Sequence, residues 1–180
     1  MRNRLLLLLP FLLLCGRMAA ASTMPVPVTV QLPLFMKIWK LDRAFPSNGE
    51  IVMGIIYQES HGPSAIVKSQ VESWIASSGQ HIRGVPIAID QPASINDINA
   101  DVFYIAPLRG ADVAGIARFA RGRHIRTITG VPEYAEAGVS VAVDVRNDRP
   151  LIVINVTSSR AEGSSFPAQL LQLARLVDAP

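Results

Sequence analysis

Residues 50–57 are the stretch that most constrains the fold of this chain. Their sequence, Glu-Ile-Val-Met-Gly-Ile-Ile-Tyr, is apolar almost without a break instead of alternating between apolar and polar residues. A strand with this pattern is buried on both faces, which is typical of a parallel sheet covered by helices on each side. The sequence around it therefore has to supply further buried strands and the helices that cover them.

Further strands and helices do alternate along the chain. Apolar runs predict strands at residues 85–89, 101–105 and 125–129. Helical spacing of apolar residues predicts one helix after the first strand, with Ser64 as its N-cap, and another over residues 112–120. A helix is also expected before the first strand, where Pro33 suits the first helical turn. This alternation predicts a parallel sheet with helices on both faces.

The C-terminal part of the chain follows a different pattern. Residues 139–145 alternate in hydrophobicity, residues 146–149 form a turn sequence, and residues 151–156 are apolar again, which predicts an antiparallel hairpin. Residues 164–177 are rich in Leu and Ala and predict a final helix that closes the core. The expected fold class is α/β: a single three-layer domain whose mostly parallel sheet is flanked by helices and has a C-terminal antiparallel hairpin.

Residues 1–21 have the composition of a secretory signal peptide. Arg2 and Arg4 precede an apolar run at residues 5–14, and small residues lead up to Ser22, the expected first mature residue. The run has about half of the ~20 residues that a membrane span needs, and an uncleaved anchor is the alternative. We therefore expect a periplasmic protein in which residues 22–180 form one α/β domain.

Charge and cysteine content exclude several classes of function. Three of the 17 Lys and Arg residues lie in residues 1–21, so that 14 remain to face the 14 Asp and Glu residues. A neutral domain lacks the positive field that nucleic-acid binding exploits, and we expect no nucleic-acid partner. Cys15 is the single cysteine and lies in the same leader, so the mature chain has no disulfide and no thiolate metal site.

Catalytic motifs are missing from the sequence. There is no glycine-rich nucleotide-binding loop and no Gly-x-Ser-x-Gly nucleophile elbow. The three histidines, His61, His81 and His124, are far apart and lack metal-ligand spacing. We expect no catalytic residue, no metal and no cofactor, and the protein is not expected to be an enzyme. An exported hydrolase that assembles Ser, His and Asp from distant positions is the least favoured alternative.

The loops after the predicted strands are the best candidates for a ligand site. Open α/β sheets bind ligands at the carboxyl ends of their strands, and the free N–H groups of a following helix can hold an anion. The residues at these ends are Glu59, Ser60 and His61 after the first strand, Arg109 after the third, and Thr129 and Gly130 after the fourth. Ordinary connecting loops are the alternative interpretation.

A group of arginines follows the helix at residues 112–120. Arg118, Arg121 and Arg123 lie at or near its end, where cations interact with the helix dipole for about 0.3–1 kcal/mol each. The alternative is that they contact a partner, either an acidic patch of a protein or an anionic membrane surface.

Several weak motifs, taken in their order, resemble one family. They are residues 35–43, 51–57, 102–105, 127–130, 135–138, 154–156 with Gly163, and 169–175. With these segments the chain resembles the YfiR-like family of bacterial periplasmic domains. The resemblance implies a non-catalytic exported domain; the family's namesake restrains a membrane-bound diguanylate cyclase and so lowers cyclic di-GMP signalling. The namesake's disulfide-dependent behaviour does not carry over, because the mature chain has no cysteine.

Two classes of function follow as expectations. The first is a regulatory or sensory domain that binds the periplasmic part of a membrane-bound signalling protein, such as a diguanylate cyclase or a histidine kinase. The second is a periplasmic receptor for a small anion or nucleotide, resembling one lobe of a solute-binding protein. The two are compatible if a ligand controls partner binding, and a homo-oligomer is a further open alternative.

Overall fold

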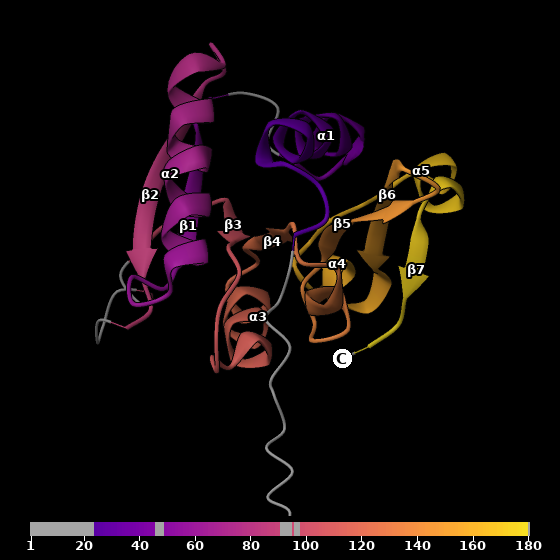
Figure 1. Ribbon diagram of the computed structural model, residues 1–180. Coiled ribbons are helices and arrows are strands. Elements are labelled where there is room, and N and C mark those ends of the chain that lie inside the picture. The colour runs from indigo at the N-terminus through magenta and orange to yellow at the C-terminus, as the bar shows by residue number, and fades with distance from the viewer. Residues whose placement is uncertain (1–23, 46–48, 91–94, 96–97, 180) are drawn as a thin grey trace, which may run out of the picture.

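A seven-stranded sheet forms the centre of the protein. The structure, a computed structural model, describes residues 24–45, 49–90, 95 and 98–179, so that the predicted signal peptide and Cys15 lie outside the described residues. The strand order is β2-β1-β3-β4-β5-β6-β7, which runs across Figure 1 from β2 to β7. The elements are α1 (Val28–Leu41), β1 (Ile51–Tyr57), α2 (Gly62–Ser77), β2 (Ile82–Ala88), β3 (Val102–Ile105), α3 (Val113–Gly122), β4 (Arg126–Thr129), the 3₁₀ helix η1 (Pro132–Ala135), β5 (Val141–Arg146), β6 (Arg149–Asn155), α4 (Val156–Ala161), α5 (Ala168–Leu173) and β7 (Arg175–Val177).

The sheet is mostly parallel, with one antiparallel pair. Neighbouring strands from β2 to β5 run parallel, β5 and β6 form an antiparallel hairpin, and β7 adds to β6 in parallel. In the hairpin turn Asn147 and Asp148 have φ values of 51° and 58°, as a two-residue type I′ turn requires. The predicted fold class, including the C-terminal hairpin, is confirmed.

Both faces of the sheet are buried, because successive strand residues point to opposite sides. In β3, Val102 and Tyr104 join the core that α1 and α2 cover. Phe103 and Ile105 join a second core, which α3 covers. The continuous apolar strands of the sequence thus correspond to three layers, with helices on each side of the sheet.

The start of α1 differs from the prediction. The helix begins at Val28, after Pro27, and Pro33 lies inside it instead of in its first turn. Val28 and Leu32 are both buried. The free energy gained by their packing exceeds the cost of the helical hydrogen bond that Pro33, which has no backbone N–H, cannot donate. At the other end of the helix the side chain of Leu41 is 49% exposed.

The start of α2 was also predicted wrongly. The helix begins at Gly62, its N-cap residue is His61, and Pro63 occupies the first turn. Ser64 is buried, and its hydroxyl accepts a hydrogen bond from the backbone N–H of Gln58 at 2.9 Å. The serine therefore ties the loop after β1 to the helix instead of capping it.

The predicted helix over residues 164–177 is mostly absent. Only Ala168–Leu173 is helical; the backbone extends at Ala174, and Arg175–Val177 form β7. Without β7, the hairpin strand β6 would leave its outer edge unpaired, and the parallel pairing supplies hydrogen bonds there. Leu170 is buried as expected, whereas Leu173 is 74% exposed. Within the described residues no helix is both long and apolar enough to cross a membrane.

Candidate functional site

The loop after β1 is held by the carboxylate of Asp90, just beyond β2. The backbone N–H groups of Glu59 and Ser60 donate to this carboxylate at 3.2 and 2.9 Å. These hydrogen bonds, above all the one from Ser60, lower the pKa of Asp90 from its usual value. The backbones of two predicted ligand residues thus fix the loop.

Arg109 and His61 face two separate hollows at this end of the sheet. The backbone N–H of Arg109 donates to the side-chain Oε1 of Gln58 at 2.9 Å, which joins the loops after β3 and β1. Arg109 also lines an open hollow of about 490 Å³ beside α3, together with Asp90 and Asp112. His61 lines a different hollow of about 550 Å³, between α2 and the segment that leads into α1.

Thr129 and Gly130 are part of the protein interior. The hydroxyl of Thr129 donates to the Ile105 carbonyl at 2.8 Å and accepts from the Val131 N–H at 3.1 Å. Gly130 lies against the side chain of Gln31, which would collide with any Cβ at this position. The structure therefore brings the three predicted loops to one end of the sheet, but Arg109 and His61 line two different hollows and Thr129 belongs to a buried network. Glu59 and Ser60 are exposed. A shared ligand site for them stays a prediction.

The three predicted partner-contact arginines have different surroundings. Arg118 pairs with Asp112 at 3.4 Å on the surface, and the Arg123 guanidinium lies 4.8 Å from the ring centroid of Phe119. Arg121 is partly buried, and its Nη1 donates to the Gly138 carbonyl and to the Ser158 hydroxyl at 3.2 and 3.1 Å. Arg121 thus links α3 to α4, whereas Arg118 and Arg123 are accessible on the surface.

The described residues contain no group of three His, Cys, Asp or Glu side chains that could hold a metal ion. His124, one of the three histidines, has a positive φ of 56°, and its Nδ1 lies 3.1 Å from the Ala161 carbonyl. This contact with a backbone carbonyl places His124 between the end of α3 and α4.

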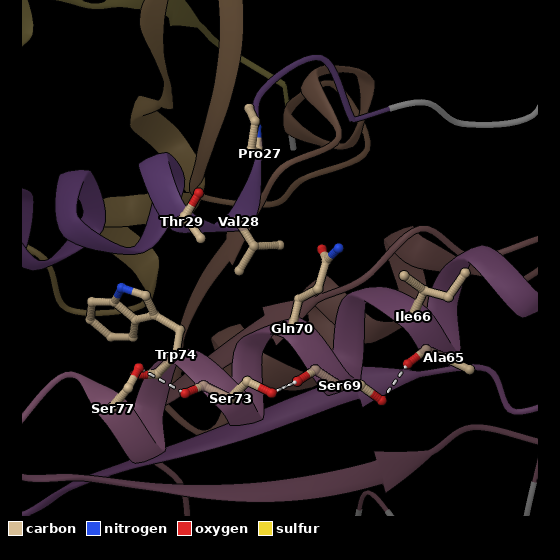
Figure 2. A pocket seen from close by; sticks show the side chains of 10 residues that line it. All are labelled: Pro27, Val28, Thr29, Ala65, Ile66, Ser69, Gln70, Ser73, Trp74 and Ser77. Carbon is tan, nitrogen blue, oxygen red and sulfur yellow. Dashed lines mark hydrogen bonds between the residues drawn. The ribbon is translucent and has the colours of Figure 1, made fainter.

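A groove lies between α1 and α2. Its volume is about 700 Å³, and Figure 2 shows Val28 and Thr29 on one side with Gln70 and Trp74 on the other. None of the lining side chains carries a charge. They belong to Pro27, Val28, Thr29, Ala65, Ile66, Ser69, Gln70, Ser73, Trp74 and Ser77. The groove continues into the hollow beside His61, since Pro27, Val28, Ile66 and Gln70 line both.

A row of small side chains makes one flank of this groove smooth. Ala65, Ser69, Ser73 and Ser77 recur every four residues along α2, which places them on one side of the helix. Each serine hydroxyl donates to the carbonyl four residues earlier, at 2.8–3.1 Å (Figure 2). The hydroxyl protons are therefore already used within the helix. Small side chains of this kind let a second helix approach closely.

Sequence reasoning missed this groove. Ile66 is a large apolar residue of α2, yet it is 59% exposed at the groove. The repeat of small residues at positions 65, 69, 73 and 77 was the available signal. This repeat indicates a groove only when it is known that α1 lies beside α2.

Comparison with known proteins identifies the family of this chain and solved structures with a similar fold. Residues 58–175 match the family model described as YfiR/HmsC-like. Among solved structures, the chain is similar to a conserved domain protein from Vibrio cholerae, with a TM-score of 0.62 and 14% identity over 84% of this chain and 60% of that one. It is also similar to an ABC domain from Streptococcus pneumoniae in complex with L-Trp, with a TM-score of 0.54 and 13% identity over 78% of this chain and 61% of that one.

The chain spans about three fifths of the length of both solved structures. At these identities the likeness concerns the fold alone. No curated protein matches the chain. The range that matches the family begins at Gln58, directly after β1, and therefore includes α2 but not α1.

Proposed function

The chain belongs to the YfiR/HmsC-like family, and on this basis we propose that it is an exported regulatory domain whose α1–α2 groove binds the periplasmic part of a membrane signalling protein. The partner would be a protein such as a diguanylate cyclase or a histidine kinase. Binding would regulate it if the domain has different affinities for the partner's active and inactive states, because only a difference in affinity shifts such an equilibrium.

The uncharged groove is the observation that carries this proposal. Ile66, which lines it, exposes apolar surface, and burying such surface contributes about 25 cal/mol per Å². An amphipathic helix laid in an apolar groove is a common mode of recognition. The smooth flank formed by Ala65, Ser69 and Ser73 suits a helix, because close approach needs small side chains on one of the two surfaces.

Deletion of the gene, followed by complementation, tests the proposal. We expect cyclic di-GMP to rise on deletion if the partner is a cyclase, and to return to its original level with the wild-type gene. Ser73→Arg places a long charged side chain in the groove and should fail to restore the level. Ala76→Arg changes an exposed residue of α2 outside the groove and should restore it. An unchanged level on deletion, with no membrane protein co-purifying, would exclude the cyclase as partner.

A small-molecule receptor is the second candidate function. The open hollow lined by Arg109, Asp90 and Asp112 lies at the strand ends, where ligands of open α/β sheets bind. A protein of similar fold, the streptococcal ABC domain, has been solved in complex with L-Trp. A thermal-shift screen of anions, nucleotides and amino acids tests this function, since a specific ligand raises the melting temperature. A hit should be weakened by Arg109→Ala, and the absence of any shift at millimolar ligand would count against a receptor.

A further inference from the structure

Residues 162–167 carry the chain from one face of the sheet to the other. The preceding helix, α4, packs against α3, whereas Leu170 of the following helix, α5, belongs to the core on the α1 side. Two buried carboxylates, those of Glu162 and Asp42, hold this crossing segment at its two ends. The elements α5 and β7 follow this segment directly.

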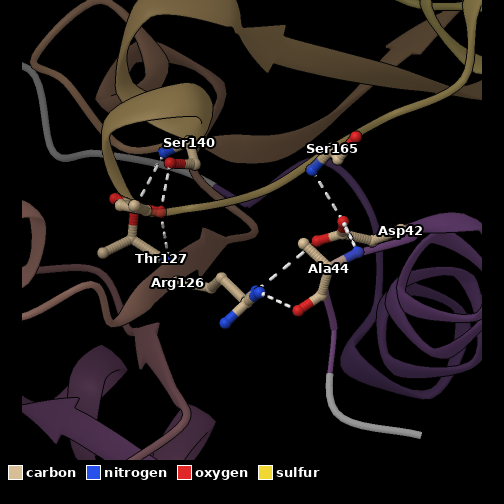
Figure 3. A network of polar contacts seen from close by, with 7 residues as sticks. Asp42, Ala44, Arg126, Thr127, Ser140 and Ser165 are labelled. Atoms are coloured by element: carbon tan, nitrogen blue, oxygen red, sulfur yellow. Dashed lines mark hydrogen bonds and ion pairs between the residues drawn. The ribbon is translucent and has the colours of Figure 1, made fainter.

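The first attachment is the side chain of Glu162, which is fully buried. Its Oε2 accepts the backbone N–H of Thr127 at 2.8 Å and the hydroxyl of Ser140, and its Oε1 accepts the hydroxyl of Thr127 at 2.6 Å. The Thr127 hydroxyl in turn accepts the N–H of Ser140 at 2.8 Å. Figure 3 shows Thr127 and Ser140 together in this network. One carboxylate thus joins the end of α4 to the start of β4 and to the residue before β5.

The second attachment is the carboxylate of Asp42, at the end of α1. It accepts the N–H of Ser165 at 2.7 Å and the N–H of Ala44 at 3.0 Å, and it pairs with Arg126 at 3.5 Å (Figure 3). The Arg43 N–H donates back to the Ser165 carbonyl at 3.2 Å. The crossing segment is therefore fixed on the α1 side as well.

Few charged groups face Glu162. Arg121, from α3, is the cation that acts on its carboxylate, and it is bonded to Ser158 and Gly138. His124 contacts the neighbouring Ala161 carbonyl, and Arg126, next to Thr127 in β4, pairs with Asp42. Arg160 of α4 is exposed. Three hydrogen-bond donors and one partly buried arginine thus offset only part of the cost of removing water from the ionised carboxylate. When the carboxyl group is neutral, its own proton can be donated to the Ser140 hydroxyl oxygen, because a serine hydroxyl accepts as well as donates.

We propose that Glu162 is a proton-dependent latch, which holds the crossing segment and the α5–β7 end firmly when its carboxyl group is neutral and loosens them when it is ionised. Burial raises the pKa of Glu162 from 4.5 to about 7, although the hydrogen bonds from Ser140 and Thr127 and the charge of Arg121 lower it. Once the segment opens, water reaches the carboxyl group and its pKa returns to the usual value. Opening therefore becomes easier as the pH rises from 4.5 to about 7, and changes little above that.

Hydrogen exchange of the purified protein at pH 5 and pH 8.5, corrected for the intrinsic chemical rate, tests the latch. Peptides that cover residues 162–177 should exchange at least about tenfold faster at the higher pH, relative to peptides that cover β3. Glu162→Gln cannot ionise, and its amide can replace the neutral carboxyl group, so that this difference should disappear. Glu50→Gln alters an exposed glutamate paired with Arg83 and should keep the wild-type difference.

A second variant distinguishes a latch from a merely structural residue. Ser140→Ala removes one donor to the ionised carboxylate, which should move the midpoint of the pH transition upward. The proposal is overturned if the wild type shows no pH dependence in residues 162–177, if Glu162→Gln retains that dependence, or if Ser140→Ala leaves the midpoint in place. The wild-type measurement is decisive even if Glu162→Gln does not fold.

Discussion

The hydroxyl of Tyr104, in the centre of β3, donates a hydrogen bond of 2.8 Å to Oε1 of Gln31 in α1. Both side chains are fully buried, and Nε2 of Gln31 donates to the Val26 carbonyl just before the helix. Burial raises the pKa of Tyr104 well above its usual value, so the phenol stays neutral and remains a donor. This polar contact fixes the position of α1, and hence of one wall of the groove.

Tyr104→Phe should destabilise the protein by about 1–2 kcal/mol, because it leaves the buried Oε1 of Gln31 without its donor. Urea unfolding measures the loss. Tyr57→Phe is the matched control: this ring lies in the next strand and is only partly buried, and it contacts Lys68 through its face, which Phe retains. A loss no larger for Tyr104→Phe than for Tyr57→Phe would contradict the assignment.

Gly130→Ala should destabilise the protein by roughly 1–3 kcal/mol, because the new methyl group would collide with the Gln31 side chain. Gly122→Ala, at the end of α3, meets nothing within 4 Å and should be neutral or slightly stabilising. Thermal unfolding of the two variants makes the comparison. Equal melting temperatures would show that Gln31 can move aside.

Stability should fall as the pH rises from 4.5 to about 7, because Glu162 has a folded-state pKa of about 7. In that range the unfolded carboxyl group ionises freely while the buried one retains its proton, so that the folded state binds more protons. The loss from this group is on the order of 3 kcal/mol. Urea unfolding of the wild type and Glu162→Gln gives the two pH profiles, and parallel profiles over this interval would contradict the prediction.

The layered fold could be predicted because its signals are local. The continuous apolar run in β1 indicates burial on both faces, and the spacing of Val113, Ile116 and Ala120 indicates a helix with one buried side. The turn residues Asn147 and Asp148 accept positive φ and thereby identify the hairpin. Each of these patterns depends on neighbours in the chain, so one sequence suffices to read them.

The elements that were predicted wrongly depend on distant parts of the chain. Residues 175–177 have no strong strand pattern and form β7 because β6 offers a free edge. Pro33 is tolerated in α1 because the buried residues on either side of it pack against the sheet. The groove arises from the placement of α1 beside α2, and the Glu162 network joins α4 to β4 and Ser140. The spacing of residues along the sequence gives no information about such contacts between distant parts of the chain.

Site-specific photo-crosslinking in the native cell tests most directly whether the α1–α2 groove is the partner-binding surface. A photoreactive residue at position 73 lies in the groove, and one at position 76 lies on the same helix outside it. We predict an adduct from position 73, and none from position 76, with an integral membrane protein that carries a signalling domain. Equal labelling from both positions, or adducts from position 73 only between two copies of this chain, would contradict the account.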